Sequence, residues 1–111
     1  MEGEQPPRVL SLVTTVGSQA DAQQLAGLLL ERRLAACVQV EPGLVSHYVW
    51  QGRRCEEPEL RLTIKSLPDR AAALKALFDQ HHPYELPQFL STELDASSEY
   101  AAWVAESLAQ L

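Results

Sequence analysis

The sequence has few basic residues, and this shortage excludes one class of partner. Nine Lys and Arg residues stand against 15 Asp and Glu residues, so the formal net charge is −6. A protein that follows a nucleic-acid backbone needs clustered cations to displace counterions. Here the basic pairs Arg32-Arg33 and Arg53-Arg54 are isolated from each other in the sequence. We therefore expect no nucleic-acid partner.

Long apolar runs are also missing. Leu28-Leu29-Leu30 is among the longest, whereas a helix that crosses a bilayer needs roughly 20 apolar residues. The first seven residues contain Pro6, Pro7 and acidic side chains, without the apolar segment of an export signal. We expect no membrane partner, a flexible N-terminal tail over residues 1–7 and a single domain over residues 8–111.

Cysteine is scarce as well. Cys37 and Cys55 are too few for a disulfide framework and do not have the spacing of a zinc finger. Because no export signal is visible, we expect a cytoplasmic protein whose two thiols stay reduced. Cys37 lies between small apolar residues, which is typical of a packed core thiol. Cys55 follows Arg53-Arg54 and is expected to be a surface thiol in a hairpin.

What the sequence does contain is a regular order of strand and helix patterns. Residues 8–15 are β-branched and Leu-rich, which predicts a buried strand. Ser18, with Asp21 three residues later, predicts the start of a helix that runs to about Arg33. The next strand is expected over residues 34–40, and Pro42-Gly43 is expected to end it.

The second half of the chain continues the alternation. A strand over residues 44–50 leads into a turn at Gln51-Gly52, and the return strand, residues 60–65, alternates apolar and polar side chains. A helix is expected to start near Pro68 and to end before Pro83. A strand over residues 88–94 and a last helix from Ser97 or Ser98 complete the order.

This order predicts an α+β fold of the ferredoxin-like βαββαβ type, with an extended hairpin and an added C-terminal helix. Helices in such a fold lie on one face of the antiparallel sheet and leave the other face in need of cover. A chain of 111 residues is too short to bury both faces by itself. We therefore expect an oligomer.

Five stretches, in order, resemble the CutA family of divalent-cation tolerance proteins. They are LAACVQV (34–40), YVWQG (48–52), LRLTIKS (60–66), HHPYELP (81–87) and YAAW (100–103). Together they span about the whole chain after the tail. The resemblance implies a ferredoxin-like subunit in a tight homotrimer, similar in architecture to the trimeric nitrogen-regulatory signal proteins.

The resemblance also implies a role in tolerance to divalent cations such as copper, which some members bind through paired histidines and a cysteine on the first strand. Imidazole suits divalent copper, so we expect His81 and His82 to bind Cu²⁺ or another divalent cation weakly. Val13 stands near the position of that cysteine and removes the soft ligand. A second interpretation stays open, because His81 falls on the apolar face of its helix and could be a half-buried structural residue.

A different site is the alternative hypothesis. Several polar or amphipathic residues in or beside the five stretches are not required for core packing. They are expected to meet in an inter-subunit cleft: Trp50, Glu59, Lys65, His82, Tyr84 and Glu85. An aromatic wall, a cation and a carboxylate would suit a small anionic or zwitterionic ligand. The same residues could instead form hydrogen bonds and an ion pair between subunits.

The sequence also lacks the common motifs of catalysis. The sequence contains no Gly-rich phosphate loop, HExxH helix or nucleophile elbow. The acidic run over residues 56–59 is expected to be a solvated shoulder of the hairpin. We expect no enzymatic activity and no organic cofactor.

Overall fold

The computed structural model describes residues 5–109. Its elements follow the predicted order, with a short 3₁₀ turn (η1) before the second helix: β1 (Arg8–Val16), α1 (Gln19–Glu31), β2 (Cys37–Trp50), β3 (Arg53–Ser66), η1 (Pro68–Arg70), α2 (Ala71–His81), β4 (Leu90–Asp95) and α3 (Ser98–Leu108). The fold is therefore the expected α+β ferredoxin-like arrangement with an extended hairpin and a C-terminal helix. The predicted tail lies largely outside the described residues, since residues 1–4 are not among them.

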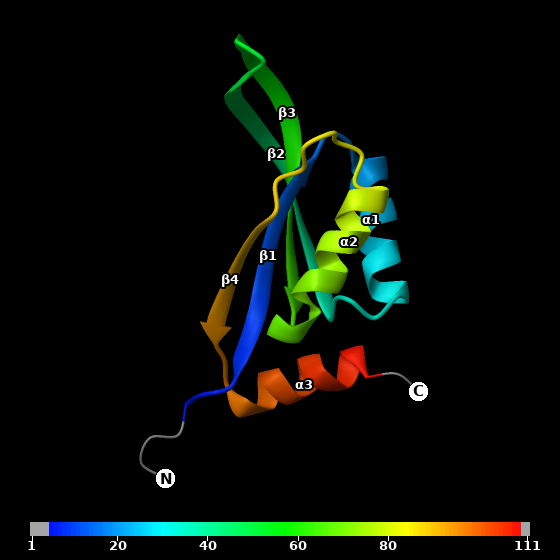
Figure 1. Ribbon diagram of the computed structural model, residues 1–111, viewed down its shortest axis with the longest axis vertical. Helices are drawn as coiled ribbons and strands as arrows, with labels where there is room; N and C mark the ends of the chain where they lie inside the picture. Colours follow the sequence, from blue (N-terminus) through cyan, green and yellow to red (C-terminus); the bar gives the residue numbers. More distant parts are fainter. Residues whose placement is uncertain (1–4, 110–111) are drawn as a thin grey trace.

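The sheet has the strand order β2-β3-β1-β4, and all its neighbours are antiparallel. The helices α1 and α2 lie on one face of it (Figure 1). Buried and less buried side chains alternate along β1 and β3, because successive residues of a strand point to opposite faces of the sheet. Leu12 and Ile64 are paired in register, and both point to the face that the helices cover. Phe78 of α2 joins them in the main core. The helix α3 crosses the end of the sheet, where Val104 and Leu108 pack on Val9.

The helices begin where side-chain oxygens can satisfy free amide groups. The backbone N–H of Asp21 donates to the Ser18 hydroxyl at 3.1 Å, and that of Tyr100 donates to the Ser97 hydroxyl at 3.1 Å. Both serines have extended backbone angles, which is typical of an N-cap residue. The sequence left Ser97 and Ser98 open for α3, and the cap is Ser97.

Two predicted strand boundaries in the hairpin of β2 and β3 differ from the structure. The predicted break at Pro42-Gly43 is wrong, because β2 continues through it and the register merely shifts between Glu41 and Leu44. Gly43 has φ +84°, a left-handed conformation that glycine adopts without strain. Proline and glycine are tolerated at an irregularity in an edge strand, and β2 is an edge strand.

The return strand begins seven residues earlier than predicted, at Arg53 rather than Leu60. The acidic run is therefore part of the ladder, with Glu56 opposite His47 and Pro58 opposite Val45. The turn at Gln51-Gly52 is confirmed, with φ values of 50° and 77°. Two positive φ values are characteristic of the turns that match the twist of a long hairpin.

The sheet face opposite α1 and α2 is open and carries mixed side chains. The Lys65 ammonium donates to Gln39 Oε1 at 3.0 Å, and Arg61 forms an ion pair with Glu41 at 3.1 Å. On the other edge strand, β4, Leu90 and Leu94 are exposed, and their register with β1 places them on this face. This face is the one that the sequence analysis expected a partner subunit to cover.

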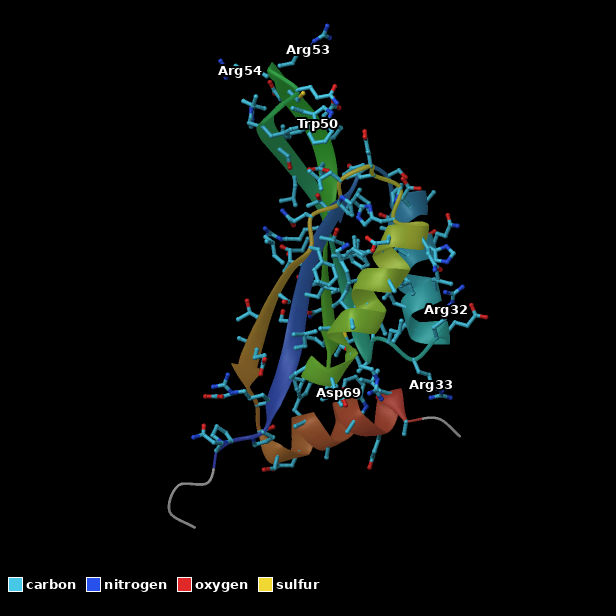
Figure 2. The ribbon with its side chains drawn as sticks, in the orientation of Figure 1. Arg32, Arg33, Trp50, Arg53, Arg54 and Asp69 are labelled. Atoms are coloured by element: carbon cyan, nitrogen blue, oxygen red, sulfur yellow. The ribbon has the colours of Figure 1, made fainter. Side chains whose placement is uncertain are left out.

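The two basic pairs lie far apart in the molecule. Arg32 and Arg33 follow α1, whereas Arg53 and Arg54 lie at the tip of the hairpin (Figure 2). They therefore do not combine into one basic surface. Among the described residues, no helix is long and apolar enough to cross a membrane.

Candidate functional site

A cavity of about 720 Å³ lies between the hairpin and the segment that joins α2 to β4. One wall comes from β1, β2 and β3, and the other from residues 83–88. The hairpin contributes Ser46, Tyr48 and Trp50 from one face of β2, since these residues alternate along the strand. The structure thus brings Trp50, Glu59, Tyr84 and Glu85 of the predicted cleft to one cavity.

Glu59 and Tyr84 form the central contact of this cavity. The Tyr84 hydroxyl donates to Glu59 Oε2 at 2.6 Å, a length typical of a hydrogen bond to a carboxylate. Burial, followed by the hydrogen bond to Glu59, raises the pKa of Tyr84 well above its ordinary value, so the phenol stays a donor. A Cβ at Gly17 would lie 3.3 Å from this hydroxyl, so the absence of a side chain there gives Tyr84 its space.

His82 holds the segment next to Tyr84 in place. Its Nδ1 accepts the backbone N–H of Tyr84 at 3.1 Å, and its Nε2 lies 2.9 Å from the Thr14 hydroxyl. A backbone amide can only donate, so Nδ1 has no proton and the neutral ring has its proton on Nε2. Burial lowers the pKa of His82, which favours this neutral form. His82 is therefore engaged through both ring nitrogens.

His81 has different surroundings from its neighbour. It is exposed at the end of α2, and the buried face of that helix consists of Leu74, Leu77 and Phe78. The interpretation of His81 as a half-buried residue of the apolar face is therefore wrong. With Asp21 it lines a separate small hollow beside α1.

Residues 5–109 contain no group of three or more His, Cys, Asp or Glu side chains arranged to hold a metal ion. Of the two predicted ligands, His81 has an exposed ring, and His82 would have to give up a hydrogen bond to bind a cation. Within a single chain, the two histidines therefore do not form a ready pair of ligands.

Two of the six predicted cleft residues, His82 and Lys65, do not line the cavity. His82 lies next to it through its contact with Tyr84, whereas Lys65 lies elsewhere. It lies toward the other end of β3, opposite Ser11 and Cys37, and does not line the cavity. Cys37 is half-buried rather than in the core, and Cys55 is half-buried with its thiol 3.7 Å from the Arg53 carbonyl oxygen.

Sequence reasoning missed several residues that shape the cavity, among them His47 and Tyr48 in its wall and Thr14 and Gly17 next to His82 and Tyr84. Tyr48 could have been found, because it alternates with Trp50 on one face of a strand and both are aromatic. Thr14 and Gly17 gave no such signal, since their roles depend on contacts with residues about 70 positions later.

The fold and this cavity define a class: a ferredoxin-like subunit with an aromatic and acidic cleft along a long hairpin. The family profile described as CutA1 divalent ion tolerance protein matches residues 10–107. The divalent-cation tolerance protein CutA of Yersinia pestis is 39% identical over 98 residues, which cover 87% of this chain and 82% of that protein.

Solved structures agree with this match. The divalent cation tolerance protein from Thermus thermophilus has a TM-score of 0.84 and 36% identity, and the match covers 89% of this chain and 97% of that one. CutA from Synechococcus elongatus has a TM-score of 0.88 and 34% identity, covering 96% and 95%. The chain belongs to the CutA family of divalent-ion tolerance proteins.

Proposed function

We propose that this protein takes part in the response to divalent cations as a non-catalytic, cytoplasmic homotrimer whose inter-subunit clefts bind a small ligand. The observation that carries the proposal is the cavity in which buried Glu59 accepts a hydrogen bond from Tyr84. The free thiols of Cys37 and Cys55 support a reducing compartment.

Exposed apolar side chains support the assembly. Val45 is 56% exposed and Val49 is 69% exposed, both on the hairpin face that points away from Trp50. The strands β2 and β4 form the two edges of the sheet and can accept further strands. A monomer that left these edges and side chains in water would be prone to association.

The cavity is wide open in one subunit, and this supports its place in a cleft between subunits. Its lining follows the hairpin from Glu59 to Trp50. The hairpin projects beyond the helices (Figure 1), so a neighbouring chain that packs on it would close the open side of the cavity. Closure would remove water and strengthen polar contacts to a ligand.

A substitution on the hairpin tests the assembly. We expect Val49→Asp to convert the oligomer to monomers that keep the native far-UV circular dichroism, because an aspartate buried between subunits would lack a partner. Leu30→Asp is the matched control, since Leu30 is also exposed but lies on α1. Sedimentation velocity of the wild type that shows only monomers would refute the trimer.

Weak binding of a divalent cation is the second candidate, and the exposure of His81 beside Asp21 favours it. We expect His81→Ala to reduce the binding of Cu²⁺ in calorimetric titration. His82→Ala should leave it nearly unchanged, because both nitrogens of His82 already have hydrogen-bond partners. The two variants binding Cu²⁺ as well as the wild type would remove this candidate.

A further inference from the structure

The charges that line the cavity are negative. Glu59 and Glu85 both line it, together with the imidazole of His47, and no Lys or Arg does. Of the cations on β3, Lys65 and Arg61 are engaged on the open face with Gln39 and Glu41. Arg53 and Arg54 lie next to the turn, opposite Trp50 and Val49, and do not line the cavity. The hypothesis of an anionic or zwitterionic ligand depended on Lys65, so its basis is missing within the subunit.

Glu59 has the greatest need of a cationic partner among these residues, because it is buried. It is only 8% exposed, although it lines the cavity. Its Oε2 accepts the Tyr84 hydroxyl, and among residues 5–109 no Lys, Arg or His lies within ion-pair distance of it. A carboxylate that is removed from water without a cation is costly, and a cationic ligand would relieve that cost.

Aromatic rings surround the same space. Tyr48 and Trp50 come from the hairpin, and Tyr84 comes from the opposite wall. The face of an aromatic ring attracts a cation through its quadrupole, most strongly for tryptophan. Rings on both walls and a carboxylate in the same cavity are the features that recognise an organic ammonium group.

A divalent metal ion suits the cavity less well. Hard divalent cations require several oxygen ligands, and residues 5–109 contain no cluster of three or more potential ligands. The aromatic walls supply no ligand to such an ion, whereas they would cover the carbon atoms of an organic one.

We propose that this cavity binds a small organic cation, with an ammonium group on Glu59 and an apolar body against the aromatic wall of Tyr48 and Trp50. The inference rests on the proposed ligand-binding role and adds the chemical class of the ligand. The cation enters as a free small molecule, and a basic side chain of a second copy is the competing occupant that the test must separate.

Three probes of equal length separate charge from shape: phenethylammonium, 2-phenylethanol and phenylacetate. Trp50 fluorescence reports on the cavity if the other tryptophan is removed by Trp103→Phe, and Trp103 lies on α3. The native oligomer is titrated at pH 7 and constant ionic strength. We expect phenethylammonium to bind at least about tenfold more tightly than the other two, as for a charge-assisted contact.

A pair of variants tests the assignment to Glu59. Glu59→Gln keeps an oxygen to accept the Tyr84 hydroxyl but loses the charge, so it should weaken phenethylammonium binding by about tenfold. Glu106→Gln removes the same charge from an exposed position on α3 and should leave binding unchanged. Equal weakening by the two substitutions would overturn the assignment.

The remaining outcomes distinguish a failure of this inference from a failure of the proposed ligand-binding role. Equal binding of phenethylammonium and 2-phenylethanol, or tighter binding of phenylacetate, would show that the ligand is not a cation. The proposal that the cavity binds a small ligand would then still hold. Failure of all three probes to change Trp50 fluorescence, with loss of the trimer in Glu59→Gln, would overturn both and assign the cavity to subunit contact.

Discussion

The two ends of the hairpin formed by β2 and β3 differ, although they belong to one continuous ladder. At the end under the helices, Leu62 and Ile64 are fully buried. Toward the tip, Val45 and Val49 are more than half exposed. The difference arises because α1 and α2 cover only the lower part of the sheet (Figure 1). The lower end belongs to the core of the subunit, and the upper end is exposed in the single chain, where the proposed binding and assembly would take place.

The comparison predicts its largest effect in the core. Phe78→Ala removes a fully buried ring that packs edge-on against Phe89, with centroids 5.2 Å apart. The free energy of unfolding should fall by about 3–5 kcal/mol, the usual cost of such a cavity. Urea unfolding at several protein concentrations should show a loss that does not depend on concentration.

Val49→Ala provides the contrast at the tip. Any loss of stability should appear only through association, and should therefore vary with protein concentration. A concentration-independent loss as large as that of Phe78→Ala would contradict the distinction between the two ends.

A smaller effect is expected where the two ends meet. Tyr84→Phe removes the donor to Glu59 and leaves a buried carboxylate without it. The expected loss is about 1–3 kcal/mol of unfolding free energy. Tyr100→Phe is the control, since Tyr100 is exposed on α3, and it should change stability by less than about 0.5 kcal/mol.

The smallest effect is a pH dependence. Because burial lowers the pKa of His82, the unfolded chain takes up a proton that the folded chain does not. This contribution to stability is complete above the unfolded value of about 6.5 and declines as the pH falls below it. His82→Gln should show a shallower fall in melting temperature between pH 7 and 5.5. Parallel profiles for the two proteins would rule out His82 as the titrating group.

The order of elements could be predicted because it depends on local signals. Ser18 and Ser97 cap helices through amides three residues later, and Gln51-Gly52 closes its hairpin within a turn. The boundary errors at Pro42-Gly43 and at Arg53 have a common cause. Proline and acidic residues disfavour a strand locally, but a long hairpin keeps its pairing across them.

The candidate site was less accessible to sequence reasoning. Glu59 and Tyr84 could be proposed as site residues from their polar character, whereas the hydrogen bond between them joins positions 25 residues apart. The exposure of His81 beside half-buried His82 depends on where α2 ends, which a pattern fixes only to within a few residues. The placement of Lys65 outside the cavity follows from its register, which composition does not reveal.

The sheet order also bears on how the chain folds. Pairing of β2 with β3 needs only a two-residue turn, whereas β1 must meet β4 across nearly the whole chain, with Arg8 opposite Asp95. Closing the longer loop costs more chain entropy. We predict that the hairpin zips first and that β4 docks last, so amides of β4 should gain protection late in pulse-labelled refolding. Early protection of β4 would reverse this order.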